Sequence, residues 1–164
     1  MNETEKYLTN LFGDQKVSKA DGRIAFRGLI DSLEAEFIEA QVMASERGEK
    51  DICEKLGEIL NYLRILMGSE VKETQLEPPF LFGLEANEIH RQSHNTCPFV
   101  LPDYTQGPVA ARINKLRAKV REAELLAVRV FGQAPKPRDD IILALNRLSS
   151  ALWWLFCSYI QEKR

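Results

Sequence analysis

The chain has 164 residues, a length that fits one domain. Hydrophobic residues make up 45% of it, which is enough for a core and excludes a disordered composition. The formal net charge of −2 lacks the strongly basic balance of nucleic-acid-binding proteins, so we expect no nucleic-acid partner, whereas local basic patches for small anions remain compatible with it.

The apolar residues follow a helical period almost throughout, and strand alternation is almost absent. Residues 1–20 are predicted to form a short helix that stops near Gly13, followed by a loop. Two long helices are predicted at 23–47 and 51–67, each with an apolar residue every three or four positions. A glycine follows each of them, and Gly68 is the predicted stop of the second.

The second half of the chain continues the helical pattern after a connector that contains Pro78 and Pro79, which cannot lie inside a helix. A short helix is predicted at 84–94 and two long ones at 109–131 and 138–161. The expected fold class is therefore all-α: an antiparallel bundle of four long helices plus a short one.

The expected division of the chain is an N-terminal segment at 1–20 and a single helical-bundle domain at 21–164. The polar, acidic N-terminus has no apolar segment after it, which indicates no signal peptide. The longest apolar runs fall short of the roughly 20 residues that span a bilayer, so no membrane contact is expected. The three cysteines, Cys53, Cys97 and Cys157, lack disulfide-framework spacing and indicate free thiols in a reducing cytoplasm.

Polar side chains flank the apolar stripe near the middle of three helices. They are Arg27, Asp31 and Glu34 on the first helix, Arg117, Arg121 and Glu124 on the third, and Asn146, Ser149 and Ser150 on the last. Such residues build either a cleft or a solvated face, whose ion pairs contribute roughly 0.2–0.5 kcal/mol each. A buried Asn146 without partners would cost a few kcal/mol. Periodicity alone leaves both interpretations open.

Several segments, taken in order, resemble ATP:cob(I)alamin adenosyltransferases. They are FRGLIDS (26–32), FVLP (99–102), RAKVREAE (117–124) and LNRLSS (145–150). The ethanolamine-utilisation type is the nearest branch, on the segments KADGRIAFR (19–27), IHRQSH (89–94) and KVREAE (119–124). The resemblance covers roughly residues 17 to 160, and it rests on the order and spacing of the motifs.

The resemblance implies a trimeric five-helix bundle with active sites between subunits. Its activity would be transfer of the 5′-deoxyadenosyl group from ATP to cob(I)alamin, in the cytoplasm or in a bacterial microcompartment. ATP, cobalamin and Mg²⁺ are the implied cofactors. The implied partners are the other subunits of a homotrimer, and a reductase or a cobalamin-dependent lyase.

The resemblance also assigns roles to residues. Asp31 would pair with Arg121 of a neighbouring subunit at the catalytic centre. The implied nucleotide contacts are Arg117 and Arg121 for positioning, Glu124 and Asn146 for adenosine, and Lys16, Lys19 and Asp21 over the triphosphate and its Mg²⁺. Phe99 and Tyr104 would supply aromatic surface near the corrin, where the lower axial ligand of cobalt is displaced.

The sequence departs from the related propanediol-utilisation branch at several positions. The phosphate loop expected within residues 1–20 is only a thin substitute, at 16–22, for the Gly/Thr-rich loop of that branch. Glu122 and Leu125 stand in place of arginines, and Ser150 stands in place of an Asp. These departures keep an alternative open, a non-catalytic cobalamin- or nucleotide-binding bundle of the same fold. The ethanolamine branch usually has a further N-terminal region with a His/Cys metal motif, so we expect a short form or a truncated chain.

Other residues leave structural and functional interpretations open. His90 and His94 lie one helical turn apart with Cys97 just beyond, a spacing that can chelate a transition metal but lacks a defined fourth ligand. Capping or loop packing is the other interpretation. Cys53 and Cys157 are expected in the core or an interface. For Trp153 and Trp154, packing is favoured over ligand stacking.

Overall fold

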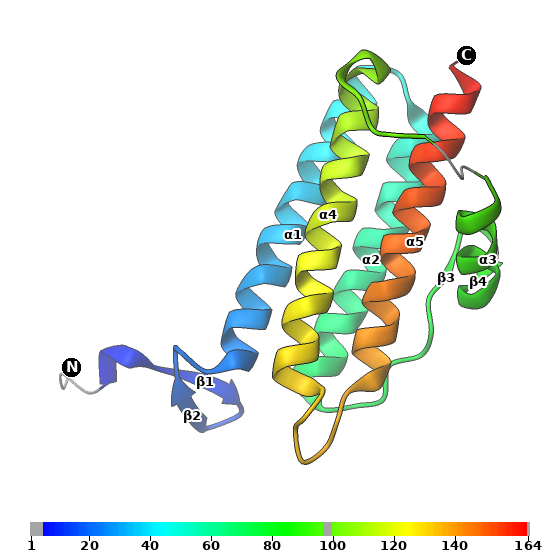
Figure 1. Ribbon diagram of the computed structural model, residues 1–164. Coiled ribbons are helices and arrows are strands. Elements are labelled where there is room, and N and C mark those ends of the chain that lie inside the picture. Colours follow the sequence, from blue (N-terminus) through cyan, green and yellow to red (C-terminus); the bar gives the residue numbers. More distant parts are fainter. Residues whose placement is uncertain (1–4, 97–99, 164) are drawn as a thin grey trace.

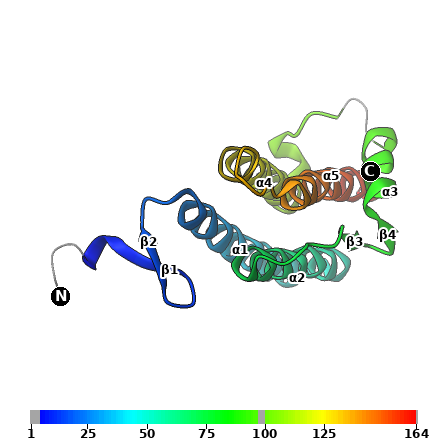
Figure 2. The same cartoon turned by 90° about the horizontal axis from the view of Figure 1, so that it is seen from below.

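The computed structural model describes residues 5–96 and 100–163, and these form a helical bundle (Figure 1). The helices are α1 (Gly22–Glu46), α2 (Lys50–Lys72), α3 (Ala86–Thr96), α4 (Gly107–Phe131) and α5 (Asp139–Glu162). In end view α1 and α2 form one layer and α4 and α5 the other, with α3 on the outer side of α5 (Figure 2). This arrangement confirms the predicted bundle of four long helices and a short one.

The shorter elements join or precede these helices. They are the 3-10 helices η1 (Glu5–Tyr7) and η2 (Tyr104–Gln106), and the strands β1 (Leu8–Phe12), β2 (Gln15–Ser18), β3 (Phe80–Leu81) and β4 (Leu84–Glu85). Strands β1 and β2 form one antiparallel pair, and β3 and β4 form another.

The core lies between the two helix layers and consists of the predicted apolar stripes. All six stripe residues of α1, from Phe26 to Ala44, are at most 3% exposed. Helix α5 is long and apolar enough to cross a membrane by length and composition, but 56% of its apolar stretch is buried in the bundle. Its hydrophobicity therefore belongs to a core helix, which packs against α4 and α3.

The N-terminal prediction is wrong, because the segment expected to be a helix and a loop contains a β-hairpin. Leu8 pairs with Ser18 and Asn10 with Lys16, and Lys19 closes the hairpin by donating its backbone N–H to the Tyr7 carbonyl at 2.8 Å. Gly13 has a φ of +53°, so it makes the turn between strands rather than ending a helix. Only Leu11 of this hairpin is buried, so the sequence has no apolar alternation there from which the strands could be predicted.

Helix α2 continues beyond its predicted stop at Gly68 and ends at Lys72. The next residue, Glu73, takes the left-handed conformation with a φ of +55° and caps the helix. An interior glycine costs a helix only about 1 kcal/mol. The buried contacts of Ser69 and Glu70 hold the additional turn in place.

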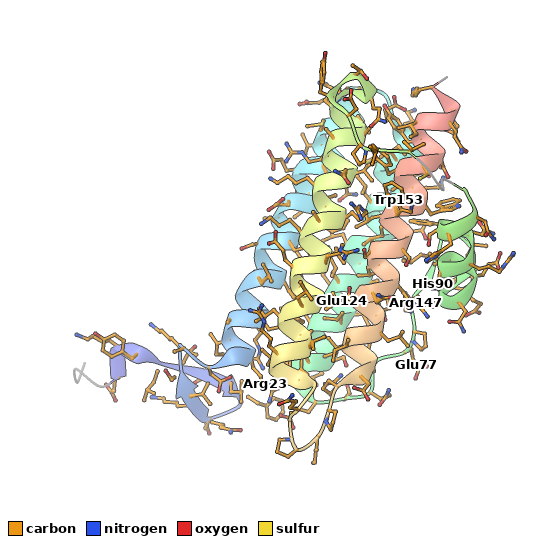
Figure 3. All side chains as sticks on the ribbon, viewed as in Figure 1. Arg23, Glu77, His90, Glu124, Arg147 and Trp153 are labelled. Carbon is orange, nitrogen blue, oxygen red and sulfur yellow. The ribbon has the colours of Figure 1, made fainter. Side chains whose placement is uncertain are left out.

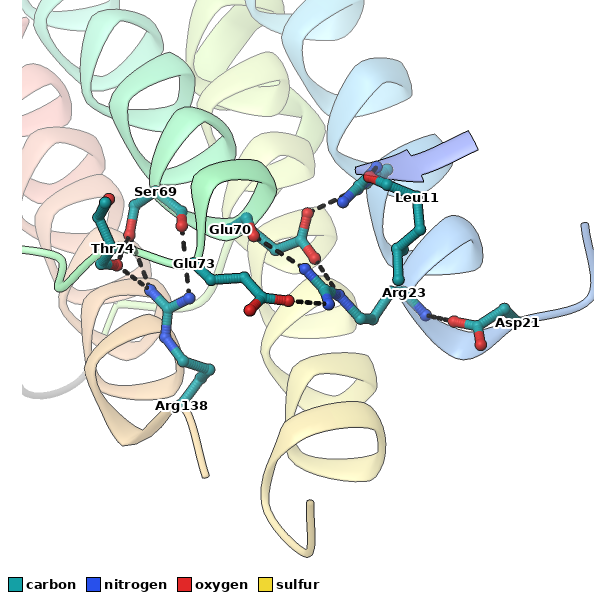
Figure 4. A network of polar contacts seen from close by, with 9 residues as sticks. Leu11, Asp21, Arg23, Ser69, Glu70, Glu73, Thr74 and Arg138 are labelled. Atoms are coloured by element: carbon teal, nitrogen blue, oxygen red, sulfur yellow. Dashed lines mark hydrogen bonds and ion pairs between the residues drawn. The ribbon is translucent and has the colours of Figure 1, made fainter. Parts of the chain in front are cut away.

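A buried carboxylate joins α1, α2 and the hairpin (Figure 4). Glu70 is fully buried, and it accepts hydrogen bonds from Arg23 Nε at 2.5 Å and from Arg27 Nε at 2.6 Å. Arg27 also donates through Nη1 to the carbonyl of Leu11 at 2.7 Å. Arg27 therefore ties the hairpin to the bundle, and its own geometry depends on Glu70.

Two further contacts extend this network at the same end of the bundle. Burial alone would lower the pKa of Arg23, but its hydrogen bonds to Glu73 and Glu70 outweigh that effect and raise the pKa. Arg138 donates to Ser69 Oγ at 2.7 Å and pairs with Asp140 at 2.9 Å, which connects the start of α5 to the end of α2.

Replacing Glu70 with glutamine should destabilise the fold strongly. The Glu70→Gln amide keeps the volume but removes the charge between two guanidinium groups and points its N–H₂ donors at one of them. Loss of one partner from a buried ion pair costs about 3–5 kcal/mol, measurable as a lower free energy of unfolding in urea. The control, Glu73→Gln, removes a 60% exposed carboxylate from the same Arg23 and should cost less than about 1 kcal/mol. Equal losses in the two variants would contradict this account.

Candidate functional site

A cleft of about 490 Å³ lies between α3, α4 and α5, near the middle of the bundle. Figure 3 labels one residue from each wall: His90 on α3, Glu124 on α4 and Trp153 on α5. The complete lining is His90, Ser93, His94, Arg117, Arg121, Glu124, Leu125, Asn146, Ser149, Ser150 and Trp153. Four of the sequence-predicted site residues, Arg117, Arg121, Glu124 and Asn146, thus share one cavity.

Helical spacing explains why these side chains converge. Arg117, Arg121 and Glu124 are separated by four and three positions, so they project from one face of α4. The polar residues of α5, which are Asn146, Ser149 and Ser150, face the same space, because α5 packs along α4. Asn146 Nδ2 donates to Glu124 Oε1 at 3.0 Å and joins the two polar faces.

Asn146 and Ser150 on α5 have hydrogen-bond partners. Arg147 donates from Nη1 to Asn146 Oδ1 at 2.8 Å, so both ends of the Asn146 amide are engaged. Ser150 Oγ donates to the Asn146 carbonyl at 3.3 Å. These contacts remove the cost that a half-buried Asn would otherwise carry, and they orient its amide toward Glu124.

The two arginines make one side of the cleft positive. Burial lowers the pKa of Arg117, and repulsion from Arg121 lowers it further. A guanidinium stays charged in proteins nonetheless. Arg117 lies 5.1 Å from the ring centroid of Trp153 and donates from Nε to Asn114 Oδ1 at 3.2 Å. This cation–π contact holds the charge at a site suited to an anionic group.

The two tryptophans pack within the protein, as the sequence favoured. Trp153 stacks on Phe156 with ring centroids 5.3 Å apart, in addition to its contact with Arg117. Trp154 stacks on Phe82 at 5.4 Å and lies beneath Lys55. Both indole rings therefore already have partners inside the chain.

Sequence reasoning noticed the histidine pair on α3 but did not place it in this cleft. His90 and His94 have ring centroids 4.4 Å apart and line the cavity beside Ser150. Their position depends on how α3 packs against α5, which the short sequence of α3 does not indicate. Cys97, the third residue of the possible metal group, lies outside the described residues. Within 5–96 and 100–163 no cluster of three His, Cys, Asp or Glu side chains could hold a metal ion.

The remaining predicted site residues lie away from the cleft of their own chain. Lys16 and Lys19 are exposed on the hairpin, on the opposite side of the bundle from α3 (Figure 2). Asp31 is exposed on α1, and Tyr104 is 88% exposed in η2. Phe99 is outside the described residues. One chain therefore assembles the α4 and α5 residues but not those expected from its N-terminal half.

The sequence is similar to curated corrinoid adenosyltransferases. It is 35% identical over 156 residues to the corrinoid adenosyltransferase EutT of Salmonella typhimurium strain LT2, covering 89% of this chain and 56% of the relative. It is 33% identical to EutT of Escherichia coli K12, with the same coverage. The chain thus spans about half the length of the curated relatives it matches.

The fold is similar to that of PduO-type ATP:corrinoid adenosyltransferases. A variant of the Lactobacillus reuteri enzyme, complexed with cobalamin and ATP, superposes with a TM-score of 0.74 at 18% identity, covering 99% of this chain and 94% of the other. Another variant of that enzyme, complexed with ATP, gives a TM-score of 0.71. The profile of the cobalamin adenosyltransferase family matches residues 2–159. This chain therefore belongs to the cobalamin adenosyltransferase family.

Proposed function

We propose that this chain transfers the 5′-deoxyadenosyl group of ATP to cob(I)alamin and so forms adenosylcobalamin. Its family membership and its similarity to two corrinoid adenosyltransferases support the activity. The observation that carries the proposal is the α4–α5 cleft, which combines two arginines with a hydrogen-bonded carboxylate–amide pair. These groups match the triphosphate and the nucleoside of one ligand.

The chemistry makes modest demands on the protein. The Co(I) centre attacks C5′ of ATP with its electron pair, the C5′–O bond breaks, and the electrons of that bond leave with the triphosphate. No proton has to be transferred, so the protein has to hold C5′ in line with cobalt and neutralise the leaving charge. In this proposal Arg117 and Arg121 supply positive charge, while Glu124 and Asn146 bind adenosine through polar atoms that do not react.

We propose that the site is completed by a neighbouring copy in a homotrimer, with Asp31 of one protomer paired to Arg121 of the next. Both side chains are exposed, and neither has an ion-pair partner among residues 5–96 and 100–163. Exposed apolar residues on the same helices support a covered face: Ile38 and Val42 on α1 are 46% and 53% exposed, and Leu125 on α4 is 60% exposed.

The hairpin would then lie over the triphosphate of the adjacent site. Lys16 and Lys19 are exposed there and can reach an anion outside their own chain. Mg²⁺ is compatible with this arrangement, because it is usually held by substrate phosphates and only one or two carboxylates. Asp21 caps α1 by accepting the N–H of Arg23 at 2.8 Å through one carboxylate oxygen. Its other oxygen would be available to the ion, which supplies positive charge to the triphosphate when bound.

The corrin would bind near the end of α3 and the segment before α4. Phe99 and Tyr104 would supply aromatic surface there and displace the lower axial ligand of cobalt. Tyr104 has the exposure that such a contact requires, since it is 88% exposed. We place the protein in the cytoplasm or a bacterial microcompartment, with a reductase that supplies Co(I) or a cobalamin-dependent lyase that takes up the product.

Substitution of the carboxylate–amide pair should strongly lower turnover without unfolding the chain. Asn146→Ala and Glu124→Ala each remove one member of the α4–α5 hydrogen bond, and with it the expected hold on adenosine. Loss of a substrate-positioning contact is expected to lower the rate by about 10²-fold. The assay is anaerobic formation of the cobalt–carbon product spectrum from ATP and chemically reduced cobalamin, with circular dichroism to verify helicity.

Gln41→Ala is the matched control for those variants. It removes a half-buried amide that donates to the Cys53 carbonyl at 3.1 Å, far from the cleft, so its rate should be close to wild type. Full activity of both cleft variants would overturn the site assignment. Tight corrinoid binding by the wild-type chain with no ATP binding in calorimetry would favour the non-catalytic alternative.

Active sites shared between subunits should give complementation between two inactive variants. Asp31→Ala and Asn146→Ala impair opposite sides of the proposed site, so each alone should be inactive. In trimers mixed at random, about a quarter of the sites would combine an intact Asp31 with an intact Asn146. Refolding or co-expressing the two chains should therefore restore a substantial fraction of the activity. A mixture as inactive as its components would show that both residues act within one chain, whereas an Asp31→Ala variant that is active on its own would show that Asp31 has no role.

A further inference from the structure

The α3 wall of the cleft carries two histidines whose tautomers are set by neighbouring hydrogen bonds. His90 Nδ1 lies 3.3 Å from Ser150 Oγ, and His94 Nδ1 lies 2.9 Å from the carbonyl oxygen of His90. A carbonyl can only accept, so His94 carries its hydrogen on Nδ1.

The same assignment follows for His90 from the serine it contacts. Ser150 Oγ already donates its hydrogen to the carbonyl of Asn146 at 3.3 Å, so toward His90 it acts as the acceptor. His90 therefore also carries its hydrogen on Nδ1. In the neutral form of either ring the lone pair is then on Nε2, and no residue in the described part of the chain hydrogen-bonds to either Nε2.

The neutral form of His90 suits a hydrogen-bond acceptor. Burial lowers the pKa of His90, and the positive charge of Arg147 and the proximity of His94 lower it further. His90 is therefore neutral at pH 7 and keeps the Nε2 lone pair. The α4 side of the cleft holds the donors Arg117 and Arg121 together with Glu124 and Leu125. The cavity thus has arginine donors on α4 that suit anions and an acceptor wall on α3.

We propose that His90 and His94 form an acceptor wall that binds an N–H₂ group of a substrate. This inference rests on the proposed function, since the two substrates of that reaction carry such groups: the exocyclic amine of adenine and the primary amides around the corrin ring. The N–H₂ group of either substrate can donate to both Nε2 lone pairs. A ligand that presents a carbonyl oxygen next to these two Nε2 atoms would be selected against.

The test compares ring substitutions that differ in acceptor capacity. His90→Phe and His94→Phe keep ring volume but remove the acceptor, whereas His90→Gln and His94→Gln place an amide oxygen near the Nε2 position. Arg91→Phe on the same helix, whose side chain pairs with Glu88, controls for disturbance of α3. Calorimetry measures Kd for ATP, for inosine triphosphate, in which a carbonyl replaces the adenine amine, and for cob(II)alamin.

If adenine is the ligand of the wall, the Phe variants should bind ATP about 3- to 10-fold more weakly, with inosine triphosphate unchanged. If the corrinoid is the ligand, Kd for cob(II)alamin should rise by a similar factor and the ratio of ATP to inosine triphosphate affinity should stay constant. In either case the Gln variants should recover part of the loss, and Arg91→Phe should match the wild type.

Three outcomes would overturn the acceptor wall. They are unchanged affinity for all three compounds in the Phe variants, Gln variants as weak as the Phe variants, and a stoichiometric transition-metal ion in the purified protein that is lost in the Phe variants. Failure of the proposed function is distinguishable from these, because a wild-type chain that binds neither ATP nor cob(II)alamin would refute the reaction itself. If the wild-type chain catalyses the reaction and the histidine variants bind all three compounds with unchanged affinity, only the acceptor wall is refuted.

Discussion

The requirement that half-buried polar groups find partners shapes the centre of this molecule. Asn146 lies within the most apolar helix of the bundle, and it is accommodated because Glu124 on α4 and Arg147 on α5 engage the two ends of its amide. This contact sets how the polar faces of α4 and α5 meet, and the cleft opens where they meet. The carboxylate–amide pair that joins α4 to α5 is therefore also the pair that we propose holds the nucleoside.

A second buried polar group organises the other end of the bundle. Glu70 is enclosed by two guanidinium groups from α1, and one of them extends to the hairpin through the Leu11 carbonyl. A charge at that depth is tolerated only because it is paired on both oxygens. The hairpin has little core of its own, so its orientation relative to α1 depends on this ionic contact rather than on apolar packing. The residues proposed to reach the triphosphate are thus carried by an element that the bundle positions electrostatically.

The two sets of proposed site residues have opposite environments within one chain. The α4 and α5 residues surround a cavity, whereas Asp31 is exposed on α1 and Lys16 and Lys19 are exposed on the hairpin. Exposed apolar side chains lie beside them on α1 and α4. This separation is consistent with the proposed trimer. In a cyclic oligomer each chain would contribute one half of a site to each of its two neighbours.

The sequence by itself determined the long helices and their polar faces. Their apolar residues recur with the helical period, so the buried stripe of α1 and the common face of Arg117, Arg121 and Glu124 could be predicted from spacing alone. Only the tertiary structure decided how the hairpin attaches to the bundle, the extra turn of α2 and the place of α3 against α5. These features depend on contacts between distant positions: Arg27 and Glu70 are 43 residues apart, and His90 and Ser150 are 60 apart. Local periodicity carries no information about such pairs, because the free energy that fixes them arises only when the helices have packed.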